Sequence, residues 1–114
     1  MPENDCLFCK VVAGEVAADV VHEGDTVIAF RDINPQAPLH VLVVPRAHHP
    51  DVGALADVDP TALAELAATG RQIAAAAGHD SYRLVFNTGA QAGQTVFHVH
   101  GHVLAGRDLT WPPG

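Results

Sequence analysis

Three histidines stand at every second position from residue 98 to residue 102, and this alternation constrains the fold more than any other feature of the sequence. Successive side chains of a β-strand point to opposite faces, so His98, His100 and His102 are predicted to share one face of one strand. The chain has 8 histidines among 114 residues. Random placement of that many would give about 0.04 triplets with the two-residue period of a strand. A chemical role explains the triplet better than chance does.

The apolar pattern predicts the remaining elements. A short helix with apolar residues from Leu7 to Val12 is expected to begin at a cap on Asp5 and to end at Gly14. A long helix is expected from Asp59 and Pro60 to Gly78, because an N-cap, an N1 proline and a terminal glycine bracket one apolar face. Strands are predicted over residues 20–22, 26–31, 40–45, 82–87 and 96–104. This order favours an α+β fold with a mostly antiparallel sheet.

Length and composition limit the chain to one domain. A protein of this mass buries about 65% of the surface of its unfolded chain, which supports one modest core. Of the residues, 48% are hydrophobic and 17% charged, which is typical of a folded chain. We expect one domain over residues 1–114, with a core from about residue 6 to 106 and a tail over 107–114. Many of the apolar residues are alanines, and so small a core favours oligomerisation.

The charge balance excludes some partners. Six Lys and Arg face thirteen Asp and Glu, for a net charge of −7, which opposes binding to nucleic acid polymers and to anionic membranes. A single nucleotide stays compatible with this charge, because backbone donors can hold a phosphate locally. The first residues are polar and acidic, unlike a targeting segment, and no uncharged run reaches membrane-spanning length. We expect a cytoplasmic protein.

The histidine strand allows more than one chemistry. Three buried structural histidines would each need a polar partner. A three-histidine zinc site would be strained, because the outer Cα atoms of a flat strand lie about 13 Å apart. Divided roles fit better: a neutral imidazole is a nucleophile near pH 7, and its neighbours can orient it or donate to an anionic oxygen. Gly93, Gln94 and Thr95 precede the strand and can cradle a phosphate.

The two cysteines, Cys6 and Cys9, have the spacing of a zinc-ligand pair on the short helix. Two reduced thiols are the alternative, and a thioredoxin-like redox pair is disfavoured because no βαβ unit follows. A four-coordinate zinc would need two further ligands.

Taken together, these residues resemble the histidine-triad (HIT) superfamily of nucleotide hydrolases and transferases. Residues 98–104, His-Val-His-Gly-His-Val-Leu, are similar to the triad signature. The Hint branch is indicated by four further segments: Cys-Leu-Phe-Cys-Lys at 6–10, Ala-Phe-Arg-Asp-Ile-Asn-Pro-Gln-Ala-Pro at 29–38, Gly-Gln-Thr-Val-Phe at 93–97 and Trp-Pro-Pro-Gly at 111–114.

The resemblance implies an α+β HIT-like fold: a five-stranded antiparallel sheet with one long and one short helix, which dimerises into a ten-stranded sheet. It implies a purine nucleoside phosphoramidate hydrolase that uses no cofactor for catalysis. His100 would attack the α-phosphorus and form a nucleotidyl-histidine that water hydrolyses. His102 would contact the phosphate and leaving group, and His98 and His40 would orient the site. Histidine at the third triad position favours hydrolysis, because the nucleotidyltransferase branch has glutamine there.

The resemblance also implies binding residues. Asp32 would accept both ribose hydroxyls, although a turn residue before Asn34 and Pro35 is the alternative. The other matched positions, for which plain packing is the alternative at the apolar ones, are Phe8, Val11, Phe30, Ile33, Asn87, Gly93, Gln94, Thr95 and Trp111. A structural zinc would be held by Cys6, Cys9, His48 and His98, with His49 an alternative to its neighbour.

The sequence departs from the family pattern at two positions, and three other functions remain as alternatives. Gly101 stands where a bulky apolar residue is usual, and Arg31 where close relatives often have histidine. The alternatives to a phosphoramidase are a dinucleoside polyphosphate hydrolase of the same superfamily, a non-catalytic nucleotide-binding or scaffold module, and a metal-dependent phosphoesterase.

Overall fold

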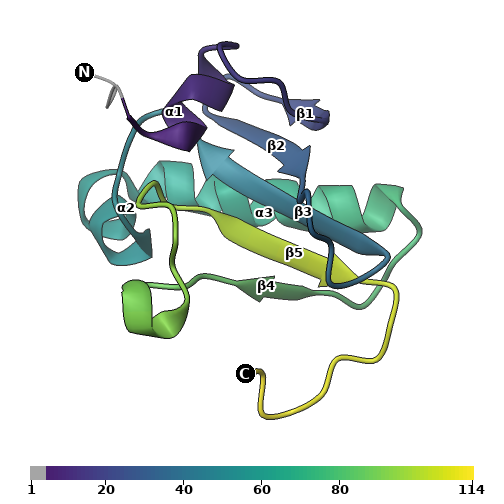
Figure 1. The fold of residues 1–114 in the computed structure, drawn as a ribbon. Helices are drawn as coiled ribbons and strands as arrows, with labels where there is room; N and C mark the ends of the chain where they lie inside the picture. Colours follow the sequence, from purple (N-terminus) through teal and green to yellow (C-terminus); the bar gives the residue numbers. More distant parts are fainter. Residues whose placement is uncertain (1–4) are drawn as a thin grey trace.

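Five antiparallel strands form one sheet in the order β1-β2-β3-β5-β4 in the computed structural model, which describes residues 5–114 (Figure 1). The strands are β1 (Val20–Glu23), β2 (Val27–Arg31), β3 (Leu39–Pro45), β4 (Arg83–Val85) and β5 (Gly101–Ala105). The helices are α1 (Leu7–Val12), α2 (Val52–Val58) and α3 (Pro60–Ala76), and η1 (Ala90–Ala92) is a short 3₁₀ turn. The prediction of an antiparallel α+β fold is confirmed. The expectation of a polar N-terminal segment without a targeting signal rests on residues 1–4 as well, and these lie outside the described residues.

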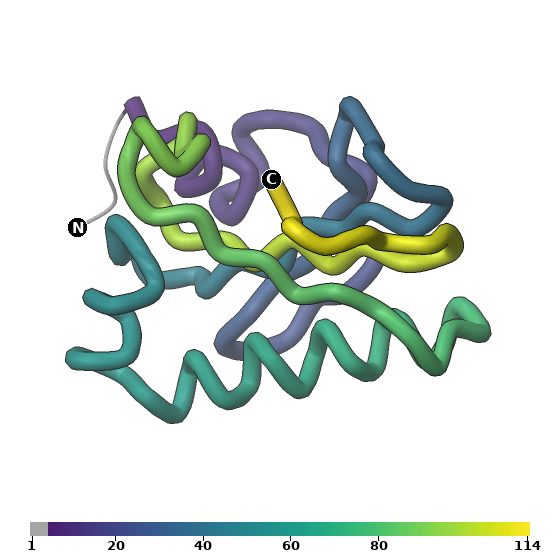
Figure 2. Tube along the Cα trace, turned by 90° about the horizontal axis from the view of Figure 1, so that it is seen from below, coloured from purple at the N-terminus to yellow at the C-terminus, as the bar shows by residue number. Residues whose placement is uncertain are grey.

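Two helices cover opposite faces of the sheet. Figure 2 shows α3 along one side of the strands and α1 on the other. The larger core joins alternate residues of β2, β3 and β5 to α3, with Leu66 fully buried at its centre. A second core joins Phe8 and Val11 of α1 to Phe30 and Leu42. Period-two alternation along β3 therefore sends Val41 and Val43 toward α3, and His40 and Leu42 toward α1.

Local signals explain most element boundaries. Asp59 accepts a hydrogen bond from the amide of Ala62 and Pro60 occupies the first turn, so α3 begins where the sequence predicts and ends just before Gly78. The predicted Asp5 cap of α1 is wrong. Cys6 is the N-cap, because its Sγ accepts from the amide of Cys9 at 3.3 Å.

The predicted strand over residues 96–104 is wrong in its first half, because β5 begins at Gly101. Its partner β3 ends at Pro45, which has no N–H to donate. The carbonyl of Pro45 accepts from His98 Nε2 at 2.8 Å, and the amide of Val99 donates to His49 at 2.8 Å. Residues 98–100 are thus held by side-chain and loop contacts in place of a ladder.

Two further predictions need correction. The chain has a second short helix, α2, in addition to the one short and one long helix expected. Strand β4 covers three residues in place of the six predicted over 82–87.

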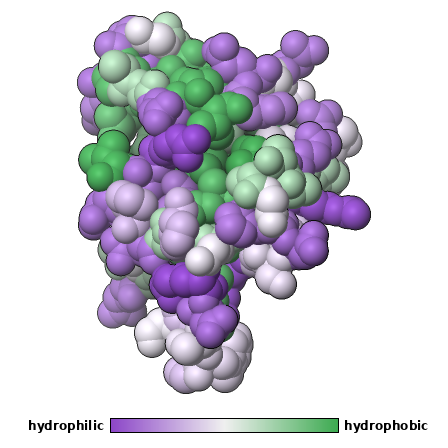
Figure 3. All heavy atoms as spheres, turned by 90° about the vertical axis from the view of Figure 1, so that its right-hand side faces the viewer, coloured by the Kyte–Doolittle hydropathy of each residue, from purple (hydrophilic) through white to green (hydrophobic). Residues whose placement is uncertain are grey.

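Among residues 5–114, no helix combines the length and the apolar character needed to cross a bilayer. On the face drawn in Figure 3, hydrophobic residues gather in the upper half, at the height of α1 and β1 in Figure 1, with hydrophilic residues around them.

Candidate active site

Aromatic rings form a continuous row on the α1 face of the sheet. His48 contacts His98 with ring centroids 5.0 Å apart, His100 contacts His102 at 5.0 Å, and His102 contacts His40 at 5.2 Å. Phe8 of α1 links the two halves, edge to face with His98 at 6.1 Å and with His100 at 4.9 Å. The structure therefore brings together on one face the three alternating histidines and His40, although β5 contains only His102.

Backbone partners determine which nitrogen of each ring carries the proton. A carbonyl only accepts, so His100 Nδ1, 2.9 Å from the carbonyl of His98, carries a hydrogen and leaves Nε2 unprotonated in the neutral ring. The amide of Gln36 only donates, so His40 Nδ1, 3.0 Å away, is unprotonated and the hydrogen of His40 lies on Nε2. That hydrogen is donated to His102 Nδ1 at 2.9 Å, with Asp32 Oδ2 at 3.4 Å. Neutral His102 then carries its own hydrogen on Nε2.

Burial keeps these rings neutral. Desolvation, with smaller contributions from the neighbouring histidines, lowers the pKa of His98 to about 4 against the opposing effect of the hydrogen bond to the carbonyl of Pro45. Desolvation, with His100 and His40 nearby, lowers the pKa of His102 to about 4 against the opposing charge of Asp32. The pKa values of His40 and His100 are also lowered, chiefly by desolvation. All four imidazoles are therefore uncharged at neutral pH, and the free Nε2 of His100 is available as a nucleophile.

A cleft of about 640 Å³ opens beside this row. Its walls include His100 and His102, the carboxylate of Asp32, and Thr95. Its apolar lining contains four of the binding positions that the family resemblance implies: Phe8, Val11, Phe30 and Ile33. Ile33 is fully exposed, which leaves its side chain available to a ligand and argues against plain packing at that position.

Other predicted contacts lie apart from the cleft. Gln94 is buried, and its side chain accepts from Gly89 and donates to Pro50 and Val96, so it shapes the loop. Asn87 and Gly93 lie side by side, with 3.8 Å from the Asn87 amide nitrogen to the position of a Cβ on Gly93, and neither is among the residues lining the cleft. Trp111 is 83% exposed and also lies outside it.

The structure adds residues that sequence reasoning missed. Leu42, Val16 and Ala18 line the cleft. The alternation of β3 would have identified Leu42, two residues after His40, whereas residues 16–18 belong to a loop without any periodic signal. Arg31 stands at the edge of the cleft, and its Nε pairs with Asp19 at 3.2 Å.

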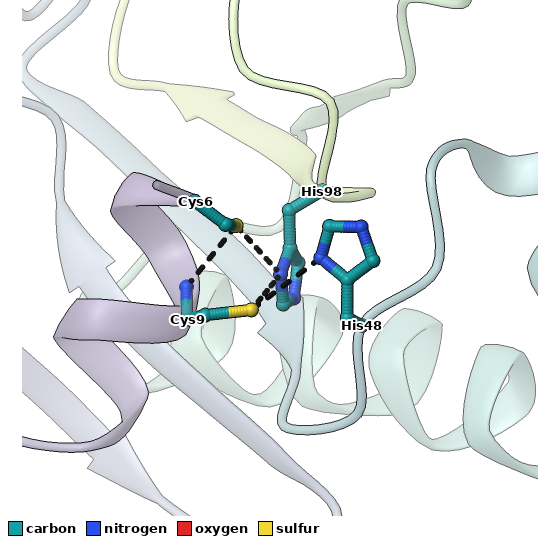
Figure 4. A group of neighbouring side chains, drawn as sticks. All are labelled: Cys6, Cys9, His48 and His98. Carbon is teal, nitrogen blue, oxygen red and sulfur yellow. Dashed lines mark hydrogen bonds between the residues drawn. The ribbon is translucent and has the colours of Figure 1, made fainter. Parts of the chain in front are cut away.

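The two cysteines meet two histidines at the end of α1. Figure 4 shows Cys6, the N-cap of α1, and Cys9, in its first turn, pointing toward His98 and His48. His98 Nδ1 lies 3.4 Å from Cys6 Sγ and 3.5 Å from Cys9 Sγ, and His48 Nδ1 lies 3.4 Å from Cys9 Sγ. Two ligands on a tetrahedral zinc, at ordinary Zn–S and Zn–N lengths, are about 3.6 Å apart. Because His98 donates from Nε2 to Pro45, its Nδ1 presents a lone pair, and the four residues fit a metal ion. Of the two neighbouring histidines, His48 is the one whose ring lies with the cysteines.

A second group, Asp32, His40 and His102, is equally close, with its ligand atoms within 4.8 Å of one another. Its chemistry is different. A ligating His40 would need an unprotonated Nε2 and a hydrogen on Nδ1, where it would oppose the amide of Gln36. This group fits a hydrogen-bond relay and does not fit a metal site.

Comparison with known proteins decides the family. The HIT domain matches residues 13–109 of the chain. The chain belongs to the HIT family. A HIT-like protein from Synechocystis, described as uncharacterized, is 45% identical over 112 residues, which are 97% of this chain and 98% of that protein.

Solved HIT structures share the fold described above. A HIT family hydrolase from Legionella pneumophila superposes with a TM-score of 0.93 at 46% identity, over 96% of this chain and 100% of that one. A zinc-bound histidine triad family protein from Mycobacterium smegmatis superposes with a TM-score of 0.81 at 37% identity, over 91% of this chain and 76% of that one.

Proposed function

We propose that this HIT protein hydrolyses purine nucleoside 5′-phosphoramidates through a covalent intermediate on His100. The observation that carries the proposal is the state of His100, a neutral ring in a cleft with its Nδ1 hydrogen held by the carbonyl of His98 and its Nε2 left unprotonated. The nucleoside would lie along the apolar wall, with its ribose hydroxyls on Asp32 and its phosphate beside Thr95 and His102.

The reaction would proceed in two displacements. His100 Nε2 attacks the α-phosphorus, the P–N bond of the substrate breaks, and the amine leaves after taking up one proton from solvent. Water then attacks the same phosphorus, the bond to His100 breaks, and a nucleoside monophosphate leaves while the proton returns to solvent. His102 Nε2–H donates to the phosphate oxygens and contacts the leaving group. Hydrogen-bond donors aimed at developing negative charge supply much of such catalysis.

The test is turnover of adenosine 5′-phosphoramidate by the purified protein, measured as release of AMP. His100→Ala is expected to abolish turnover and to keep AMP binding largely intact. The control is His22→Ala, on the edge strand β1 and outside the cleft, which is expected to retain turnover. Mass spectrometry of the quenched wild-type reaction should find the nucleotidyl group on His100. Wild type that binds AMP without turning over the substrate would make the protein a binding module instead.

A dinucleoside polyphosphate is the second substrate to assay, because the sister branch of the superfamily handles such compounds. The walls of the cleft contain one cationic side chain among the described residues, Arg31, and it is already paired with Asp19. A polyphosphate chain therefore meets little positive charge, and we expect a lower kcat/KM than for the phosphoramidate.

A metal-dependent phosphoesterase is the third alternative. Hydrolysis of the phosphoramidate that persists after metal ions are removed with a chelator would exclude it.

We also propose that a structural zinc ion is held by Cys6, Cys9, His48 and His98, and that two copies of the chain form a homodimer. The sulfur to nitrogen distances support the zinc, as does the zinc-bound relative from Mycobacterium. Elemental analysis of the purified protein should give about one zinc per chain.

A further inference from the structure

The loop before β3 and the turn after β5 meet beside the relay of Asp32, His40 and His102. Leu39 at the start of β3 is paired with Ala105 at the end of β5, so the two connections begin at the same edge of the site. Gly106 follows with a φ of +97°, and a Cβ there would lie 2.9 Å from Pro38 Cβ. A glycine is required by both the dihedral and the close approach. The first residue of the C-terminal tail, Arg107, is thereby directed over the loop.

One chain of hydrogen bonds runs from this exposed arginine to the triad. Arg107 Nε donates to the carbonyl of Gln36 at 2.8 Å, and the amide of Gln36 donates to His40 Nδ1 at 3.0 Å. His40 Nε2 then donates to His102 Nδ1 at 2.9 Å. Arg107 Nη1 also donates to the carbonyl of Asp108 at 2.9 Å, so two of its nitrogens are fixed.

The amide of Gln36, together with the carboxylate of Asp32 at 3.4 Å from His40 Nε2, determines which nitrogen of His102 carries the hydrogen. With the amide of Gln36 in place, His40 keeps its hydrogen on Nε2, and His102 keeps its hydrogen on the nitrogen away from His40. If Gln36 moved away, the reverse arrangement would become available: His40 protonated on Nδ1, and His102 donating from Nδ1 to His40. His102 Nε2 would then hold a lone pair, which repels phosphate oxygens because these only accept hydrogen bonds.

We propose that Arg107 is a positioning residue of this site: by holding Gln36 it fixes the hydrogen of His40, and through His40 it fixes the hydrogen of His102 on the nitrogen that a phosphate would meet. Arg107 is not among the residues that line the cleft, and its hydrogen bonds go to the carbonyls of Gln36 and Asp108, so its action on the histidines is indirect. The kinetic part of this proposal rests on the proposed function, and the spectroscopic part does not.

The first test is the ¹⁵N NMR spectrum of the histidine side chains, in which a protonated and an unprotonated ring nitrogen are distinct. In the wild type, His40 and His102 are expected as Nε2–H forms and His100 as the Nδ1–H form. In Arg107→Met, which keeps the apolar length and removes the donors, Nδ1–H forms of His40 and His102 should appear. His100, held by the carbonyl of His98, should be unchanged and is the internal reference.

The second test is turnover of the phosphoramidate. Arg107→Met should lower kcat/KM by about three- to tenfold, the effect expected when one net hydrogen bond is lost. The matched control is Arg83→Met. Arg83 also donates to tail backbone, from Nη2 to the carbonyl of Thr110 at 3.0 Å, but it has no bond to Gln36. Its histidine spectrum should equal that of the wild type.

Three results would overturn the proposal: wild-type His40 protonated on Nδ1, Arg107→Met with the wild-type histidine spectrum, or Arg83→Met with the same changes in the histidine spectrum as Arg107→Met. The protonation of His40 is measured on the wild type, so the proposal can be tested even if Arg107→Met fails to fold. Arg107→Gln is the second variant whose spectrum should be recorded. If the wild type does not hydrolyse phosphoramidates, the proposed function fails while the spectra still decide the role of Arg107.

Discussion

Single backbone groups give chemically identical side chains different roles in this site. The carbonyl of His98 leaves His100 with an unprotonated Nε2, whereas the carbonyl of Pro45 leaves His98 with an unprotonated Nδ1 that faces two sulfurs. The amide of Gln36 has the opposite effect on His40 and makes it a donor. His100 is thereby suited to attack a phosphorus, His98 to bind a metal ion, and His40 to orient His102.

A pH-dependent loss of stability is expected from His102. An unfolded histidine titrates near pH 6.5, and the folded pKa of His102 is about 4, so between these values the unfolded state binds more protons. The free energy of unfolding therefore falls as pH drops from about 6.5 to 4. The full shift corresponds to about 3 kcal/mol, and partial exposure of His102 reduces this to about 1–2 kcal/mol.

Urea unfolding at pH 7 and at pH 4.5 in wild type and in His102→Gln measures this contribution. The charged and titratable groups facing His102 are Asp32, His40 and His100, and these stay in the variant. The wild type should lose more stability than the variant over this interval. Equal losses would show that His102 does not retain a depressed pKa in the folded protein.

Gly101 is required by packing, and its replacement by alanine is expected to destabilise the protein. A Cβ there would lie 2.9 Å from Leu84 Cδ1, 3.1 Å from Leu66 Cδ2 and 3.2 Å from Phe86 Cζ. The absence of a side chain at this position thus lets side chains of β4 and α3 approach β5. Overpacking of this kind costs about 1–3 kcal/mol.

The matched control for Gly101→Ala is Gly53→Ala, within α2. The nearest heavy atom to a Cβ at Gly53 is Asp51 Oδ1, at 3.6 Å, which is an ordinary contact. Alanine there should raise stability by up to about 0.5 kcal/mol, because glycine is less favourable than alanine in a helix and Gly53 lies in the first turn of α2. Chemical denaturation should therefore show a lower free energy of unfolding for Gly101→Ala and a higher one for Gly53→Ala. A neutral Gly101→Ala would mean that Leu84 and its neighbours move aside freely.

At the scale of elements, the sequence predicts what local signals specify and fails where one element depends on another. Helix α3 has its own cap, proline and terminal glycine, and β3 its continuous apolar run. Helix α2 has a single buried residue, Leu55, and so carries almost no periodic signal. The start of β5 depends on Pro45 in a different strand and on a side-chain bond from His98, neither of which a strand pattern contains.

Some residues of the candidate site could likewise be predicted from the sequence, and others could not. Motif resemblance named residues that the structure brings together: the histidines, Asp32 and the apolar wall beside the cleft, and the group of two cysteines and two histidines. It did not identify Gln36 or Arg107, because a backbone amide has no residue-type signature and the arginine acts across β3 and β5. It placed Gln94 among the ligand contacts, whereas that side chain is used to hold its own loop.

Helix α1 is expected to depend on the proposed zinc. It has six residues, too few for a stable isolated helix; it contains Cys9 and the ring of Phe8 beside His100, and Cys6 is its N-cap. Removal of zinc with a chelator, or Cys9→Ser, should lower the melting temperature and increase amide exchange in α1 while α3 stays protected. Turnover should fall less than stability does. Identical exchange in α1 with and without zinc would contradict the structural role.

At the scale of the whole molecule, the chain is acidic, and its proposed phosphate site relies on uncharged hydrogen-bond donors. The net charge is −7, and the charged residues that line the cleft are Asp19, Arg31 and Asp32, of which Arg31 is paired with Asp19. The groups expected to hold the phosphate are the uncharged imidazole of His102 and the hydroxyl of Thr95. A site of this kind depends on short-range hydrogen bonds more than on long-range attraction. Salt should therefore change KM for a mononucleotide substrate only weakly.

The last prediction concerns the tail and the homodimer. Trp111 is 83% exposed and lies outside the cleft of its own chain. If it contacts the nucleotide, as the family resemblance implies, it must do so in the site of a second copy. Sedimentation equilibrium should then give twice the chain mass of 11.9 kDa, and Trp111→Ala should raise KM without changing the free energy of unfolding.

Mixing two inactive or impaired variants separates this arrangement from action within one chain. A heterodimer of Trp111→Ala and His100→Ala has one site in which His100 comes from the first chain and Trp111 from the second, and that site is complete. After subunit exchange, part of the activity should return to the KM of the wild type. If the mixture keeps the raised KM of Trp111→Ala, the tail acts within its own chain, because a complete site forms only when the two residues come from different copies.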